Sequence, residues 1–258
     1  MTIFTSEQLA QFSQAGYVIV PSLATPLECT RMLALARDHL ARAVAPVEYE
    51  TDVGYPGAPA SKEAPGGHTI RRLLQAYARD PMFAAWATDP RVIARVRQLL
   101  ARPVILPQAH HNCIMTKQPG FSSATHWHQD IRYWSYARPE LISVWLALGN
   151  ETADNGCLML LPGTHTQEFD PTRLDAALFL RPELPENKAL IGTRVFANLS
   201  AGDVLFFHAR TFHAAGRNIA RETKFSVVYT YRPDDNPPRA SSRSSVDKEI
   251  TLNWAVKT

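Results

Sequence analysis

The chain has 258 residues, of which 45% are hydrophobic, and a formal net charge of +3 at pH 7. This length is enough for one large domain with a substantial buried core. The near balance of acidic and basic residues argues against nucleic acid or a membrane surface as a partner, and no run of about 18 apolar residues is present that could cross a membrane. We therefore expect a soluble globular protein with no evident protein partner.

The cysteines and the N-terminus bear on the cellular compartment. Cys29, Cys113 and Cys157 are an odd number without paired spacing, which suits a reducing compartment. The first residues, from Met1 to Glu7, lack the basic patch and apolar core of a secretory signal. We expect a cytoplasmic protein, in a compartment that would also keep iron ferrous.

The first part of the chain, residues 1–103, is expected to be mainly helical. Thr5 or Ser6 can cap a helix with a side-chain oxygen, and Gly16 stands where a left-handed residue ends such a helix. The elements expected in this part are a helix ending near Gln14, a strand over residues 17–20, and helices over residues 26–43 and 90–101.

Residues 46–67 are dense in proline and glycine. Such a composition breaks regular structure and predicts a long loop. Loops of this length within a compact domain are usually either functional or disordered. A lid over an active site and an ordinary surface loop therefore both remain open as interpretations.

From Val104 onward, short apolar runs alternate with turn signals. Several short strands without alternating long helices favour an antiparallel sandwich or barrel over a parallel sheet. Residues 165–194 interrupt the pattern and are expected to form an insertion or crossing loop. The expected strands are residues 104–106, 112–115, 141–148, 156–161, 203–207 and 225–231.

The motif His126-Trp127-His128-Gln129-Asp130 is the strongest candidate for a functional site. Residues i and i+2 of a strand point to the same side, so His128 and Asp130 could bind one ion. Two imidazoles and one carboxylate on one face of an ion leave the other face open, as in oxygen-activating ferrous sites. The second imidazole could come from His208 or His213, farther along the chain.

Three other histidines, His110, His111 and His126, compete with His128 for the first position. His128 is preferred because only this histidine has a carboxylate two residues on.

Taken with these motifs, the chain resembles the phytanoyl-CoA dioxygenase family of iron(II)- and 2-oxoglutarate-dependent oxygenases. The likeness runs from Gly16-Tyr17-Val18 to about Tyr231 and includes His128-Gln129-Asp130. The other matching pieces are Thr116-Lys117-Gln118-Pro119, Val144-Trp145, Asn155-Gly156-Cys157-Leu158, Leu161-Pro162-Gly163-Thr164-His165, Gly202-Asp203-Val204, Phe207-His208 and His213-x-x-Gly216-x-Asn218.

The resemblance implies a mainly β fold, a double-stranded β-helix (a cupin-like jelly roll) with flanking helices packed on one sheet. We expect a single oxygenase domain over residues 1–258, with the jelly-roll core at 104–232 and a C-terminal tail at 233–258. The metal would be Fe(II), held by His128, Asp130 and His213. Related halogenases carry a small residue in place of the carboxylate, so Asp130 argues against halogenation.

For the cosubstrate, 2-oxoglutarate, the resemblance identifies a departure from the family pattern. Where the family usually has an arginine for the distal carboxylate, this chain has Lys224, followed by Ser226 in the usual cation-x-Ser pattern. Lysine offers a charge-assisted hydrogen bond but no bidentate fork. Arg221 is the alternative cation.

Three more residues align with positions near the family's cosubstrate. Arg72 takes the place of a lysine and could compensate for the missing arginine, although an exposed helix-start arginine is the alternative. Trp145 and Met115 align with residues that line the cosubstrate pocket, and ordinary sheet core is the alternative for both.

The substrate pocket has weaker candidates. Tyr133 and Trp134, with Arg138, follow the first two ligands and could form a pocket wall on a strand leaving the metal, but an aromatic core with solvated arginines would explain them equally. His126 could contact the substrate or face solvent. Gln129, between the two ligands, is a further candidate.

The expected reaction is the hydroxylation of an aliphatic C–H bond of a small-molecule substrate, using O2 and releasing succinate and CO2. Two alternatives remain: a zinc or other divalent-metal hydrolase on the same triad, and a catalytically silent jelly-roll binding module. An acyl thioester, an amino acid derivative and a natural product all remain possible substrates, because family-level analogy does not choose among them.

Overall fold

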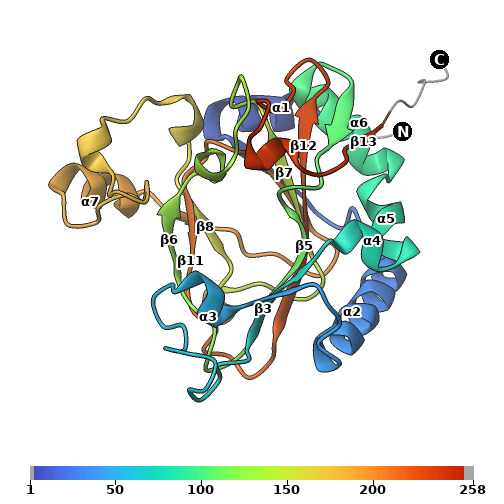
Figure 1. The fold of residues 1–258 in the computed structure, drawn as a ribbon. Coiled ribbons are helices and arrows are strands. Elements are labelled where there is room, and N and C mark those ends of the chain that lie inside the picture. The colour runs from blue at the N-terminus through green and yellow to red at the C-terminus, as the bar shows by residue number, and fades with distance from the viewer. Residues whose placement is uncertain (1–2, 253–258) are drawn as a thin grey trace.

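Two antiparallel β-sheets face each other in the computed structural model, which describes residues 3–252 (Figure 1). The smaller sheet consists, in spatial order, of β6 (Thr125–His128), β11 (His213–Ala215), β8 (Leu158–Leu160) and β9 (Val195–Phe196). The larger sheet consists of β1 (Tyr17–Val20), β10 (Val204–His208), β7 (Ile142–Ala147), β12 (Lys224–Pro233), β5 (Asn112–Lys117), β3 (Ile70–Leu74) and β2 (Val47–Tyr49), with β4 (Val104–Leu106) pairing both β12 and β13 (Ile250–Thr251). This double-sheet arrangement is a jelly roll, so the expected fold class is confirmed.

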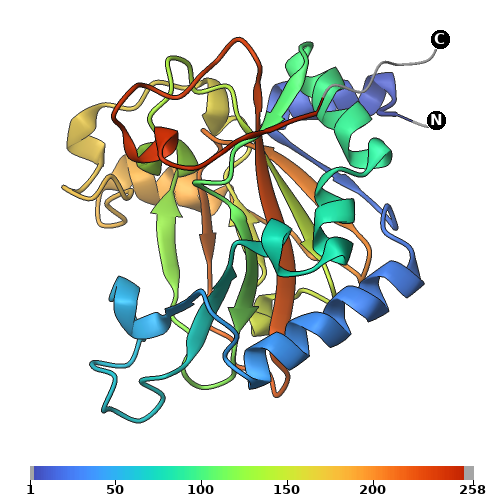
Figure 2. The same cartoon turned by 45° about the vertical axis from the view of Figure 1, so that its right-hand side comes forward.

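Four helices cover the outer face of the larger sheet (Figure 2). They are α2 (Pro26–Ala41), α4 (Ala76–Arg79), α5 (Pro81–Ala87) and α6 (Pro90–Leu100). α1 (Ser6–Ala15) begins at the Thr5 cap and ends at Gly16, whose φ of 79° places it in the left-handed region as expected. The helices α3 (Glu50–Val53) and α7 (Pro185–Gly192) lie in the segments that connect the strands.

The alternation of residues along β12 divides its side chains between two environments. Val227 and Tyr229 point outward into the core beneath the helices, where the Tyr229 hydroxyl donates a hydrogen bond to the Phe83 carbonyl at 3.0 Å. Val228, one residue on from Val227, belongs to a second apolar cluster between the two sheets. Because successive strand residues face opposite sides, Lys224 points to the same inner side as Val228.

The first hundred residues contribute more strand than the sequence predicted. Besides β1, they supply β2 and β3, which extend the larger sheet beyond β5. Residues 47–53, expected as part of a loop, form β2 and α3, and Val47 pairs with Leu73 of β3. β2 is short and half-buried, so it lacks the apolar alternation by which strands are recognised. The irregular segment therefore begins only after Val53.

None of the helices within residues 3–252 is both long enough and apolar enough to span a membrane.

Candidate functional site

The three expected metal ligands come together where β6 and β11 pair. His128 is the last residue of β6, and His213, the first of β11, lies directly opposite it. Asp130 was expected on the same strand as His128. It instead opens a 3₁₀ turn, η1 (Asp130–Tyr133). The backbone of Gln129 between them is extended (φ −106°, ψ 136°), so Asp130 still reaches the side on which His128 lies.

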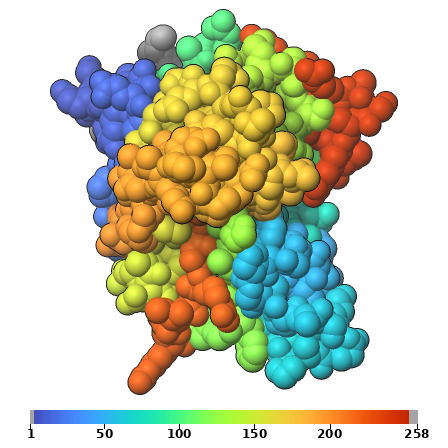
Figure 3. All heavy atoms as spheres, turned by 90° about the vertical axis from the view of Figure 1, so that its left-hand side faces the viewer, coloured from blue at the N-terminus to red at the C-terminus, as the bar shows by residue number. Residues whose placement is uncertain are grey.

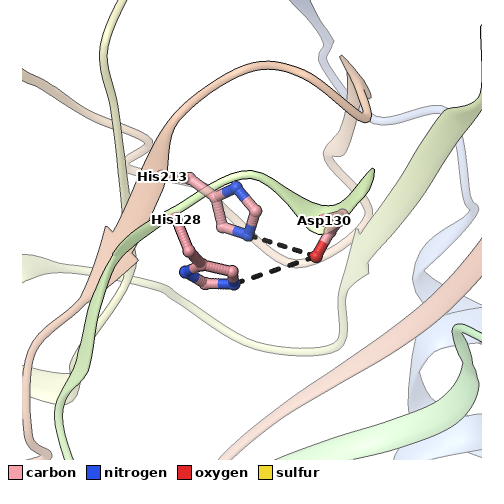
Figure 4. A group of neighbouring side chains, drawn as sticks. All are labelled: His128, Asp130 and His213. Atoms are coloured by element: carbon pink, nitrogen blue, oxygen red, sulfur yellow. Dashed lines mark ion pairs between the residues drawn. The ribbon is translucent and has the colours of Figure 1, made fainter. Parts of the chain in front are cut away.

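The donor atoms of the triad converge on one point (Figure 4). The Oδ1 atom of Asp130 lies 3.8 Å from Nε2 of His128 and 3.6 Å from Nε2 of His213. All three ligand atoms lie within 4.8 Å of one another, and all three residues are buried. Two imidazoles and one carboxylate arranged in this way can hold a divalent metal ion.

Backbone carbonyls orient both imidazole rings. Nδ1 of His128 lies 2.8 Å from the carbonyl oxygen of His126, and Nδ1 of His213 lies 3.1 Å from that of Thr211. In the tautomer with the proton on Nδ1, each ring donates to its carbonyl and directs the lone pair of Nε2 toward Asp130. The donor set thus fits a metal ion without rearrangement.

The second oxygen of the Asp130 carboxylate has its own partners. The Ser143 hydroxyl donates to Oδ2 at 3.3 Å, and Nδ1 of His111 lies 3.6 Å away. Burial acts to raise the pKa of Asp130, but His111, His213 and His128 outweigh it and lower that pKa. Burial, together with His213, holds the pKa of His128 well below its usual value. Asp130 is therefore ionised and His128 neutral near pH 7, the forms in which they bind metal.

The remaining histidines do not join the triad. His208, the rival of His213, ends β10, and its Nδ1 accepts a hydrogen bond from the Arg210 amide at 3.0 Å. His110 stacks on Trp134 with ring centroids 5.0 Å apart. His111 lies near the second oxygen of Asp130, not the oxygen that faces His128 and His213. His213 and His208 both lie on strands, but only His213 lies on the strand that pairs with His128.

A cavity of about 390 Å³ opens beside the triad and continues between the sheets. All three triad residues line it, together with several cationic side chains. These cations are Arg71, Arg72, Lys117, Lys224 and Arg243.

Most of the residues expected near 2-oxoglutarate share the inner face of the larger sheet. Arg72 pairs with Met115, and Met115 pairs with Ser226, so the three form one row across β3, β5 and β12. Trp145 lies opposite Val228, in the neighbouring row. Arg72, Met115 and Trp145 line the cavity, whereas Ser226 does not.

Lys224 is held by a buried glutamate that the sequence did not identify. Its Nζ donates to Oε2 of Glu151 at 2.9 Å and to the Ser226 hydroxyl at 3.1 Å. Oε1 of Glu151 accepts from the Ser226 hydroxyl at 2.6 Å and from Nε1 of Trp145 at 2.9 Å. The side chains of Lys224 and Glu151 are 3% and 0% exposed. The cation at the expected position is thus already neutralised by a carboxylate.

The two alternative cations differ in position. Arg72 lines the cavity, with its Nε 3.2 Å from Oε1 of Glu48. The same Glu48 oxygen accepts from Nη1 of Arg71 at 2.9 Å, so two arginines share one carboxylate oxygen. Arg221 is exposed in the turn before β12 and does not line the cavity.

The substrate-pocket candidates divide into two groups. Tyr133 and Trp134 line the cavity. Both were expected on a strand, but Tyr133 is the last residue of η1 and Trp134 follows it. Gln129 donates to the Arg210 carbonyl at 2.6 Å, outside the cavity lining. The exposed His126 side chain is also outside that lining.

Of the two interpretations of Arg138, a pocket wall and a solvated arginine, the second agrees with its position, because Arg138 does not line the cavity. Its guanidinium lies on the surface, where it pairs with Glu140 at 2.9 Å and with Asp235 at 2.7 Å. The pocket-wall interpretation assumed that a strand continues from the metal ligands through Arg138. The chain instead turns at η1, several residues before Arg138.

Two segments far apart in the sequence meet over the metal side of the cavity. Figure 3 shows the segment from 165 to 194 beside the segment from 50 to 67 on one face of the molecule. Tyr55 from the second segment and Phe179 from the first have ring centroids 6.0 Å apart, and Phe179 lies 5.8 Å from the ring of His128. The Tyr55 hydroxyl also contacts the Tyr133 hydroxyl at 2.7 Å. An aromatic layer therefore lies beside the candidate ligands.

Comparisons with known proteins agree with this architecture. The family model described as phytanoyl-CoA dioxygenase matches residues 12–225. A probable phytanoyl-CoA dioxygenase of Caenorhabditis elegans is 26% identical over 249 residues, covering 91% of this chain and 77% of the relative. An ectoine dioxygenase of Bordetella bronchiseptica is 25% identical over 257 residues, covering 91% of this chain and 78% of the relative.

Solved structures show the same fold. EctD from S. alaskensis with bound Fe superposes with a TM-score of 0.76 at 20% identity, covering 96% of this chain and 83% of the other. The epimerase SnoN, in complex with Fe3+, alpha ketoglutarate and nogalamycin RO, superposes with a TM-score of 0.72 at 24% identity, covering 90% and 85%. Together with the match of the family model to most of its length, these findings show that the chain belongs to the phytanoyl-CoA dioxygenase family of non-haem iron, 2-oxoglutarate-dependent dioxygenases.

Proposed function

We propose that the chain binds Fe(II) through His128, Asp130 and His213 and uses 2-oxoglutarate and O2 to hydroxylate an aliphatic C–H bond of a small molecule. The other products would be succinate and CO2. The observation that carries this proposal is the convergence of two Nε2 atoms and one carboxylate oxygen beside a cavity with buried cations.

The chain's own residues would hold and orient the reactants. Bound iron would supply the activation of O2, chemistry that protein side chains do not supply. The buried carboxylate of Asp130 occupies the position that a halide would need, which favours hydroxylation over halogenation. The aromatic residues Tyr55, Tyr133 and Phe179 would keep water away from the metal side of the cavity.

We further propose that 2-oxoglutarate lies on the inner face of the larger sheet. Trp145 and Met115 would form its walls, and Lys224 would donate to its distal carboxylate. Ser226 would act indirectly, because its hydroxyl joins Lys224 to Glu151. Arg72 would lie at the opposite side of the same face. These assignments rest on the strand register and on the cavity lining.

Among the substrate-pocket candidates, the cavity lining favours Tyr133 and Trp134. Gln129 and His126 would have indirect roles, since the first contacts Arg210 and the second offers its carbonyl to His128. The curated relatives carry names that point to different substrates, phytanoyl-CoA and ectoine. The proposal is therefore limited to a small-molecule substrate. A cytoplasmic location is proposed from the absence of paired cysteines.

The test is an anaerobic titration of the protein with Fe(II) and 2-oxoglutarate. A weak visible charge-transfer band should appear in the unaltered protein and not in His128→Ala. After oxygen is admitted, succinate should form faster than in that variant. Absence of the band, together with tight zinc that supports activity, would instead favour a hydrolase. Absence of succinate above the His128→Ala background would favour a silent binding module.

A further inference from the structure

Two buried lysines lie directly opposite each other on neighbouring strands of the larger sheet. Lys117, the last residue of β5, pairs with Lys224, the first residue of β12, and both line the cavity. Like charges directly opposite in a sheet repel each other, and burial of a charge without compensation is costly. Each lysine therefore requires an anion or the loss of its proton.

Lys224 has its anion within the protein. Glu151 accepts from Lys224 on one carboxylate oxygen, and the other oxygen is occupied by Trp145 and Ser226. The Lys224–Glu151 pair is neutral as a unit, and two of the three ammonium donors of Lys224 are taken by Glu151 and Ser226. The pair can donate to a ligand, but it brings no net charge to it.

The hydrogen-bond partners of Lys117 are neutral groups. Its ammonium donates to the Ser123 carbonyl at 2.7 Å and to the Gly216 carbonyl at 2.6 Å. Within residues 3–252 it forms no ion pair, and an ammonium has three donors, of which these carbonyls take two. Burial, followed by the charge of Lys224, lowers the pKa of Lys117 to about 7.

Two arginines of the cavity lining, Arg71 and Arg72, are better compensated than Lys117. Arg71 is 5% exposed and lies 2.9 Å from Glu48 and 3.9 Å from Glu50. Arg72 shares Glu48 with it at 3.2 Å. Lys117 is consequently the buried cation of the cavity lining that lacks a carboxylate partner in the part of the chain described here.

The surroundings of Lys117 are shaped to hold it. A Cβ atom at Gly156 would lie 2.5 Å from the Gly216 carbonyl oxygen and 2.8 Å from Cδ of Lys117. Gly156 also has a φ of +74°, in the left-handed region that favours glycine. The glycine therefore allows both the lysine stem and its acceptor carbonyl to approach.

We propose that Lys117 is the cosubstrate-binding cation of this chain, supplying the positive charge that recognises the distal carboxylate of 2-oxoglutarate, while the neutral Lys224–Glu151 pair supplies a neighbouring hydrogen bond. The inference rests on the proposed function and assigns a charge role to a residue beyond that proposal. One carboxylate entering between the lysines would complete the pairing of Lys117 and relieve its repulsion with Lys224. Lys117 thereby compensates for the arginine that Lys224 replaces.

The test compares two ligands that differ only at the distal end. 2-Oxovalerate keeps the 2-oxo acid group and the chain length of 2-oxoglutarate but ends in a methyl group. The dissociation constants of both ligands are measured by calorimetry with the Fe(II)-loaded protein under anaerobic conditions. The proteins compared are the unaltered chain, Lys117→Met, Lys117→Gln, the double variant Lys224→Met/Glu151→Gln, and Lys188→Met, which changes an exposed lysine on α7.

The unaltered chain and Lys188→Met should prefer 2-oxoglutarate over 2-oxovalerate strongly. Lys117→Met should reduce that preference by about 30-fold or more, as expected when one partner of a buried charge pair is removed. Lys117→Gln removes the charge but keeps an N–H donor, and it should reduce the preference to the same extent if Lys117→Met does not fold. The double variant, which removes both charges of a neutral pair, should reduce the preference far less.

Four results would overturn the inference. Equal loss of both ligands in the Lys117 variants would show a structural role for this lysine. An unchanged preference in those variants, or a larger loss in the double variant, would assign the charge elsewhere while leaving the proposed function intact. Failure of the unaltered protein to bind 2-oxoglutarate at all would instead overturn the proposed function, and the inference with it.

Discussion

His128 and His213 face each other directly across two paired strands, with ring centroids 4.3 Å apart. Each ring is oriented by a carbonyl two residues earlier in the chain, at His126 within β6 and at Thr211 just before β11. The backbone pairing of β6 and β11 therefore sets the distance between the two nitrogen donors. Asp130 is the ligand whose position depends on a turn instead.

Asp130→Ala should abolish hydroxylation and iron retention. Loss of an outer partner of a metal ligand typically lowers metal affinity by about 10- to 100-fold, so loss of the ligand itself should cost more than about 100-fold. Iron content after gel filtration and the Fe(II) dissociation constant measure this effect. His126→Ala is the matched control, because its exposed side chain is outside the cavity lining and only its carbonyl serves His128. An Asp130→Ala protein that retains stoichiometric iron would contradict the assignment.

Ser143→Ala should weaken iron binding moderately, by about 10-fold, without changing the fold. The hydroxyl donates to Oδ2 of Asp130 at 3.3 Å and contacts the Thr230 hydroxyl at 3.2 Å. Its loss leaves the carboxylate freer to rotate but keeps the ligand. Competition with a metal indicator gives the affinity. An unchanged Fe(II) dissociation constant would show that the remaining contacts suffice to orient Asp130.

Lys224→Ala should raise the 2-oxoglutarate requirement far more than Arg221→Ala. Removal of Lys224 leaves the Glu151 carboxylate buried without its cation, next to the place proposed for an anion. Arg221 is exposed and serves as the control. The 2-oxoglutarate concentration needed for half-maximal succinate formation is the measurement. Equal effects of the two substitutions, or a larger one at Arg221, would exclude Lys224 from the cosubstrate site.

Glu151→Gln should lower the free energy of unfolding by about 3–5 kcal/mol, the usual cost of breaking a buried ion pair by removing one partner. Glu151 and Lys224 are almost fully buried, so solvent cannot replace the lost charge. Denaturant unfolding of the metal-free protein gives the value. The double variant Lys224→Met/Glu151→Gln should lose less stability than Glu151→Gln alone. A larger loss in the double variant would show that the pair stabilises mainly through packing.

Binding of 2-oxoglutarate should take up protons at pH 8 and almost none at pH 6. Burial, followed by the charges of Lys224, Arg71 and Arg217, lowers the pKa of Lys117, whereas Glu50 raises it. The resulting pKa is about 7. Above pH 7 the lysine is mostly neutral, and an incoming carboxylate raises its pKa, so a proton must bind. Affinity therefore falls as pH rises through 7.

Calorimetry in buffers of different ionisation enthalpy measures this proton uptake. Lys117→Met should show none at pH 8, and 2-oxovalerate should cause none in the unaltered protein. Equal uptake by the variant and the unaltered chain would assign the proton to another group.

Local patterns in the sequence were sufficient for much of the fold. The Thr5 cap and Gly16 placed α1, and the apolar run at 17–20 placed β1 at the bounds that the structure shows. These features depend on neighbouring residues only, which is why they can be predicted from one chain. β2 could not, because Val47 is held by its pairing with Leu73 and not by its own pattern.

For the site, the sequence by itself determined the chemistry of the metal ligands: two histidines and an aspartate in a family motif. The family resemblance already favoured His213 over His208, and the physical reason for that choice, the pairing of His213 with His128, came only from the tertiary structure. Only it brought Glu151 to Lys224 and Lys117 beside them. A strand register joins residues distant in sequence, and no local pattern encodes it. The charges that surround 2-oxoglutarate in this proposal therefore come from the fold.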